Sequence, residues 1–171
     1  MTRYRPVLHT LTAAVLCAVI TACSSTVPDS DFGTFTGDGG NRVSFPLDMS
    51  DTACAYSLSL MARFIKGEGP ESVTMDITVT SPSGVRGHET VTLPSDYEGL
   101  RRHLRGNPPD TRIRLAGTPS YYDVSWKYRS GIIPPERGEW RIDIALRDGT
   151  SGIQGAGYIL EKIQPAEGAQ Q

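Results

Sequence analysis

Apolar and polar residues alternate along most of the chain between residues 42 and 164. Such alternation is typical of β-strands that bury one face and expose the other. The runs that alternate in this way are residues 43–47, 56–64, 73–79, 113–115, 122–128 and 140–146. Short strands without a long helical repeat predict an all-β fold, a single antiparallel β-sandwich domain of about eight strands. The pattern leaves an immunoglobulin-like and a jelly-roll topology open.

The breaks between these runs contain turn-forming residues. Residues 66–70, 81–84, 134–138 and 148–152 are rich in glycine and proline, which favour turns. One break differs, because Leu100 and Leu104 are four residues apart and predict a short helical turn over residues 97–105 that ends at Gly106. The glycine-rich segment 152–157 lacks a following helical pattern, so we interpret it as the start of a strand or a β-bulge rather than a phosphate-binding loop.

The first 22 residues have the pattern of a secretory signal peptide. Arg3 and Arg5 precede an apolar run that is too short to span a bilayer stably and that ends in small residues. The run ends in Ile20, Thr21, Ala22 and Cys23, which resembles a bacterial lipobox. The resemblance implies that Cys23 becomes the first residue of the mature protein and carries acyl chains.

The two ends of the mature chain are polar. Residues 23–41 are rich in glycine, serine, threonine and aspartate, which predicts a flexible, lipid-anchored tether. Residues 165–171 predict a disordered tail. The predicted organisation is therefore a signal peptide (1–22), a tether (23–41), a β-sandwich domain (42–164) and a tail (165–171).

Charge and cysteine content exclude some classes of protein. Removing residues 1–22 leaves 15 basic and 19 acidic side chains, a weakly acidic balance that argues against nucleic-acid binding. If Cys23 is acylated, Cys54 has no partner for an intramolecular disulfide, and a place in the core is the interpretation we favour for it.

No motif predicts catalysis, a metal site or a cofactor. The chain lacks a Gly-x-Ser-x-Gly elbow, and His88 and His103 are not in ligand spacing. His88 is predicted to face solvent on a strand. Scattered acidic residues such as Asp76, Asp123 and Asp143 leave open a weaker enzyme hypothesis, which needs two carboxylates about 5–10 Å apart in a cleft.

Two groups of side chains are candidates for contact with a ligand or partner. The densest basic cluster contains Arg101, Arg102 and Arg105 and suits anionic headgroups or an acidic protein surface. Tyr121 and Tyr122 have opposite phase on their strand, so one of them should be exposed and could bind a glycan or a protein.

Five segments follow the lipobox in order: residues 43–47 (VSFPL), 56–63 (YSLSLMAR), 75–84 (MDITVTSPSG), 135–144 (PERGEWRIDI) and 152–162 (GIQGAGYILEK). This ordered set resembles the GldH-type gliding-motility lipoproteins of Bacteroidetes. The resemblance covers nearly all of the mature chain and implies a role in gliding or the associated secretion machinery. The family has no established catalytic residues, so the resemblance implies none here.

The function that we predict is that of a non-enzymatic, lipid-anchored protein of the cell envelope. Its expected contacts are the membrane, through the lipid on Cys23, and other envelope proteins of a motility or secretion assembly. The expected location is the outer membrane, facing the periplasm. The alternative is a glycan-binding module on an envelope lipoprotein.

Overall fold

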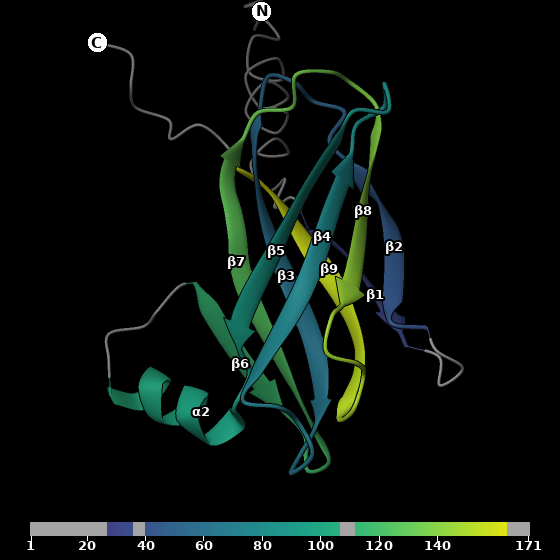
Figure 1. Cartoon of the computed structure of the whole chain (residues 1–171). Helices are drawn as coiled ribbons and strands as arrows, with labels where there is room; N and C mark the ends of the chain where they lie inside the picture. Colours follow the sequence, from purple (N-terminus) through teal and green to yellow (C-terminus); the bar gives the residue numbers. More distant parts are fainter. Residues whose placement is uncertain (1–26, 36–39, 107–111, 164–171) are drawn as a thin grey trace, which may run out of the picture.

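A computed structural model describes residues 27–35, 40–106 and 112–163. These residues form two antiparallel sheets that pack face to face, which confirms the predicted all-β sandwich (Figure 1). The strands are β1 (Asp29–Thr34), β2 (Arg42–Asp48), β3 (Ala55–Ile65), β4 (Ser72–Thr80), β5 (Arg86–Pro94), β6 (Ile113–Gly117), β7 (Tyr121–Ile132), β8 (Glu139–Leu146) and β9 (Ile153–Ile163). The strand order is β1-β9-β3-β7-β6 in one sheet and β2-β8-β4-β5 in the other.

The core lies between the two sheets and contains the inward positions of each alternating run. Leu60, Phe64, Met75 and Ile144 are completely buried there. On the opposite faces of the same strands, polar residues reach water, because successive side chains of a strand point to opposite sides. The hydrophobic pattern of the sequence therefore determines which face of each strand is buried.

The prediction of a flexible tether over residues 23–41 is wrong for residues 29–34, because these residues form the strand β1. Asp29 to Thr34 pair with Leu160 to Gly155 of β9, as the edge strand of the five-stranded sheet. The polar composition of β1 fits an edge strand, which needs little apolar surface once its backbone bonds to a neighbour. A hydrogen bond from the Tyr158 hydroxyl to Asp29 Oδ2, 2.9 Å long, also holds β1 in place.

The glycines of β9 allow β1 to approach closely. A Cβ atom on Gly157 would lie 2.1 Å from the carbonyl oxygen of Asp31, and one on Gly155 would lie 2.2 Å from that of Gly33. The register of β9 against β3 also shifts between Gly155 and Ile153, which confirms the predicted bulge in this glycine-rich segment.

The predicted helical turn is α2 (Tyr97–Gly106). Asp96 caps it, because its Oδ2 accepts a hydrogen bond of 2.6 Å from the amide of Gly99. Leu100 is buried against the core and anchors the helix to the sandwich.

The two ends of the sandwich differ in what they carry. The first, which we call the Asp29 end, contains the start of β1, the end of β9 and the β2–β3, β4–β5 and β7–β8 loops (Figure 1). The second, which we call the helix end, carries α2 and the β3–β4, β6–β7 and β8–β9 loops. Residues 1–23, with the predicted signal peptide and Cys23, and residues 165–171 lie outside the described residues.

Candidate functional site

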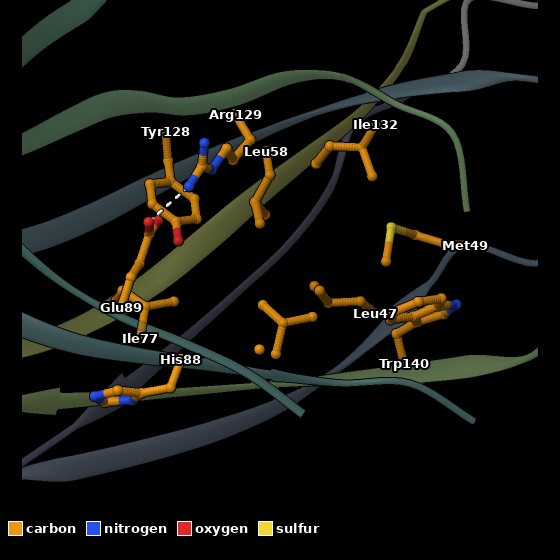
Figure 2. A pocket seen from close by; sticks show the side chains of 12 residues that line it. Leu47, Met49, Leu58, Ile77, His88, Glu89, Tyr128, Arg129, Ile132 and Trp140 are labelled. Carbon is orange, nitrogen blue, oxygen red and sulfur yellow. Dashed lines mark hydrogen bonds and ion pairs between the residues drawn. The ribbon is translucent and has the colours of Figure 1, made fainter. Parts of the chain in front are cut away.

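A cleft of about 360 Å³ opens between the two sheets near the Asp29 end (Figure 2). Both sheets and the β2–β3 loop contribute to its walls. The lining residues are Leu47, Met49, Leu58, Ile77, Val79, Gly87, His88, Glu89, Tyr128, Arg129, Ile132 and Trp140. A mostly apolar cleft of this size with a few polar groups has the properties of a small-molecule site, for which volumes of about 300–1,000 Å³ are usual.

Irregularities of β7 bring Arg129 to this cleft. The register of β7 against β3 shifts between Lys127 and Arg129, so that Arg129 pairs with the inward-facing Leu58. Strict alternation would place Tyr128 inward and Arg129 outward, whereas the bulge directs both side chains to the cleft. A second shift, at Gly131 with its φ of 72°, pairs Ile132 with the buried Tyr56.

The opposite wall of the cleft is β5, the edge strand of the four-stranded sheet. Gly87 and Glu89 have the same phase as the half-buried Val91 and Leu93, so they face the other sheet. A Cβ atom on Gly87 would meet no heavy atom within 4 Å. Gly87 therefore leaves open space where a larger residue would narrow the cleft.

Glu89 and Arg129 join the two walls. Arg129 Nη2 donates a hydrogen bond of 2.6 Å to Glu89 Oε2 (Figure 2), and the guanidinium lies 5.2 Å from the ring centroid of Tyr128. The other carboxylate oxygen, Glu89 Oε1, is buried and has no hydrogen-bond partner among the described residues. A buried acceptor without a partner costs about 1–3 kcal/mol, so this atom requires an explanation.

The β2–β3 loop supplies Met49 and is held in place by Asp51. Asp51 Oδ2 accepts a hydrogen bond of 2.5 Å from Lys162 Nζ near the end of β9. It also accepts one of 3.3 Å from the Cys54 thiol, and Oδ1 accepts one from the amide of Ala53. Of these interactions, the bond from Lys162 contributes most to lowering the pKa of Asp51 from 3.8 to about 2.

We expect the contact between Asp51 and Lys162 to weaken only in strong acid. Because the folded state lowers the pKa of Asp51, the contact contributes fully above pH 4 and is lost as the pH falls toward 2. The Asp51 carboxyl resonance in an NMR titration should therefore have its midpoint near pH 2. In Lys162→Met the midpoint should move toward 3.8, whereas a wild-type midpoint already near 3.8 would contradict the contact.

The predicted basic contact residues lie at the helix end, away from the cleft. Arg101, Arg102 and Arg105 are all on α2, and Arg102 and Arg105 are exposed. Arg101 lies 3.7 Å from Glu98 and lines a hollow of about 640 Å³ beside Lys66, Asp96 and Tyr122. The charged groups of this hollow have partners: Asp96 caps α2, and Lys66 Nζ lies 4.8 Å from the ring centroid of Tyr97.

One tyrosine of the pair Tyr121 and Tyr122 was expected to be exposed, and it is not Tyr122, which is therefore wrong as a candidate contact residue. Tyr122 is only 3% exposed, its ring stacks on Phe64, and its hydroxyl donates a hydrogen bond to the carbonyl of Ser95. Its polar atom is thus used within the fold. Tyr121, at the opposite phase, is half-buried, so the pair does not form an exposed aromatic platform.

Other predicted residues are placed as follows. Cys54 is only partly buried in the β2–β3 loop, so its predicted place in the core is wrong; the loop lies at the surface, where its thiol bonds to Asp51. His88 is exposed on β5 as predicted, and its ring forms a hydrogen bond with the Thr78 hydroxyl.

The acidic residues of the enzyme hypothesis include Asp123 and Asp76, which lie on different sheets. Asp123 pairs with Arg63 on one sheet, whereas Asp76 pairs with Arg147 on the other, so these two carboxylates share no cleft.

The described residues contain neither a metal-binding cluster nor a membrane-spanning helix. Within the described ranges, no group of three or more histidine, cysteine, aspartate or glutamate residues is placed to hold a metal ion. The helical segment described, α2, is too short and too polar to cross a membrane, and no other helix in that part of the chain does so.

Sequence reasoning did not identify Gly87, Glu89 or Arg129 as site residues. A charged residue in the inward phase of β5 was one available signal, because it breaks the alternation of Val91 and Leu93. The second available signal was Gly131, since a glycine inside a strand pattern often marks a bulge, and the register of β7 does shift there. Comparison with known proteins adds nothing to these assignments: no family model and no curated protein matches the chain.

Proposed function

We propose that this protein is a non-enzymatic, lipid-anchored component of the cell envelope that acts by binding, with its Asp29 end toward the lipid surface. The lipid would be attached to Cys23, and the binding partners would belong to an envelope assembly for motility or secretion. The resemblance to GldH-type lipoproteins suggests the assembly. The arrangement of the sandwich supports the orientation.

The position of β1 limits the distance between the domain and the membrane. β1 begins at Asp29, six positions after Cys23. Even a fully extended chain of six residues spans only about 20 Å. With a lipid on Cys23, the Asp29 end would therefore lie close to the bilayer, and the helix end would point away from it.

The observation that carries the proposal is the position of the exposed large hydrophobic side chains. Among the described residues these are Val27, Val85, Ile133 and Ile163, which are 86%, 70%, 67% and 36% exposed. All four lie at the Asp29 end: before β1, in the β4–β5 turn, after β7 and at the end of β9. Exposed apolar side chains grouped at one end suit contact with lipid or an apolar partner.

Anchoring would also serve binding directly. Confinement to one surface raises the effective concentration of other membrane-bound proteins, so weak contacts suffice for assembly. Several acyl chains would hold the protein stably, since two lipid signals are already enough.

Labelling with radioactive palmitate tests the anchor. Wild-type protein should incorporate the label and fractionate with membranes, whereas Cys23→Ser should lose both properties because it lacks the acceptor thiol. Cys54→Ser is the matched control and should behave like wild type. If Cys23→Ser protein still incorporated the label and stayed with the membranes, this would contradict lipid attachment at Cys23.

Photo-crosslinking tests the orientation and the binding role. A photoreactive residue at Ile133, at the Asp29 end, should capture lipid or envelope proteins in intact cells. The same residue at Arg105, at the helix end, should capture less lipid. Equal lipid capture at the two positions would contradict the orientation, and recovery of no envelope protein from either would contradict the binding role.

A further inference from the structure

We propose that the cleft between β5 and β7 binds one fatty acyl chain that carries an amide head, with Glu89 and Arg129 holding the amide. This inference extends the proposed function, in which the same end of the sandwich lies near lipid. It explains three features together: the apolar cleft, the unpaired carboxylate oxygen and the glycine in the wall.

The apolar part of the cleft fits a hydrocarbon chain. The half-buried Val79, Tyr128 and Ile132 offer it an apolar surface, and beneath them Leu47, Leu58 and Ile77 are closely packed, 0–2% exposed. Met49 and Trp140 extend the apolar wall toward the Asp29 end (Figure 2). Such a surface offers no specific polar partner, so it selects for an aliphatic chain by burial alone.

Glu89 and Arg129, the polar pair of the cleft, fit an amide head group better than a charged head group. Glu89 Oε1 is a buried acceptor without a partner among the described residues, and a ligand N–H or O–H would satisfy it once the Glu89 side chain, which is 33% exposed, turns toward the cleft. Arg129 keeps further N–H donors beside it, which suit a carbonyl oxygen. A free fatty acid would place its carboxylate against Glu89, and an alkylammonium would place its charge against Arg129. An amide supplies one donor and one acceptor without either repulsion.

A charge that points inward from an edge strand also protects that edge from pairing with other chains. This explains why β5 carries Glu89 and why Arg129 pairs with it. Edge protection does not explain why a cleft adjoins the pair, or why Glu89 Oε1 is buried without a hydrogen-bond partner among the described residues. A bound donor would satisfy that oxygen.

The test uses the Cys23→Ser chain and N-acyl glycinamides with acyl chains of eight, ten and twelve carbons. Calorimetry should detect one saturable site, and affinity should rise about fourfold with each methylene that the cleft buries. Gly87→Phe should weaken binding at least tenfold, because it fills space that is now open. Gly106→Phe, at a glycine on α2 whose added Cβ also meets nothing, should bind like wild type.

Head-group preference tests the polar pair independently of folding. The wild-type cleft should bind the ten-carbon N-acyl glycinamide more tightly than decanoate, the free fatty acid of the same length. Glu89→Leu removes the repelling carboxylate and leaves Arg129, so this preference should reverse. An unchanged preference in Glu89→Leu would overturn the role of Glu89, and no saturable binding, or binding unaffected by Gly87→Phe, would overturn the site.

The acyl amide has two sources at an envelope surface: the acylated N-terminus of this chain or a separate lipid. If its own acyl chain fills the cleft, the lipidated protein should not bind the probe, whereas the Cys23→Ser chain should. Equal binding by both forms would point to a separate lipid. These measurements do not depend on palmitate labelling, so failure of the anchor and failure of the cleft are distinguishable.

Discussion

Replacing Phe64 with alanine is expected to lower the free energy of unfolding by about 3–5 kcal/mol. Phe64 is completely buried on β3. Its ring stacks on Tyr122 at a centroid distance of 5.0 Å and meets the edge of Trp126 at 6.3 Å. The substitution removes the apolar ring from the core, leaves a cavity and breaks both aromatic contacts, each worth about 0.5–1.5 kcal/mol beyond burial.

Urea unfolding, followed by tryptophan fluorescence, measures this loss. Phe32→Ala is the matched control, since Phe32 lies half-buried on the edge strand β1 with the Arg63 guanidinium over its ring. Phe32→Ala should cost clearly less than Phe64→Ala, because a half-buried ring at the sheet edge loses less burial and leaves a site that can relax. Equal losses in the two variants would contradict the assignment of Phe64 to the core.

Gly157→Val is expected to displace β1 from β9 and to lower the free energy of unfolding by about 1–3 kcal/mol. The new Cβ atom would lie 2.1 Å from the carbonyl oxygen of Asp31 and 2.8 Å from Met61 Cε. The methionine side chain can move, but the backbone of β1 can move only by giving up its pairing with β9.

Hydrogen exchange locates the effect. The amides of β1 should lose protection in Gly157→Val, while those of β4 and β8 should keep it. Gly87→Val provides the control, because the same substitution on β5 meets open space. Protected β1 amides in Gly157→Val would show that the close approach of the two strands does not exist.

The same variant bears on the proposed anchor. With β1 paired, Cys23 and the first strand are six positions apart; with β1 released, the sandwich would begin at Arg42, nineteen positions from Cys23. Gly157→Val would thus restore the long tether that the sequence predicts. If the short link orients the Asp29 end, crosslinking from Ile133 to lipid should decrease in this variant.

The strands of the sandwich core were predictable from the sequence. β3, β4, β7 and β8 alternate apolar and polar residues over long spans, and the apolar positions are those that the structure buries. The short helix was also predictable, from Leu100 and the glycine that ends it. In each case the signal lies within one segment, because burial of one face is encoded in local periodicity.

β1 was not predictable in the same way. Its residues are polar and small, and they resemble a linker in composition. The strand forms because Gly155 and Gly157 of β9, more than a hundred positions away in the sequence, allow its backbone to approach and bond. A strand that depends on its neighbour for stability leaves little trace in its own sequence.

The sequence by itself determined the all-β class, the buried face of the core strands and the position of the helix. Tertiary structure alone decided the site: it separated Asp76 from Asp123 and brought Glu89 of one sheet within 2.6 Å of Arg129 of the other. Periodicity reports which side of a strand is apolar. It does not report which strands face each other, or where a bulge turns an outward residue inward.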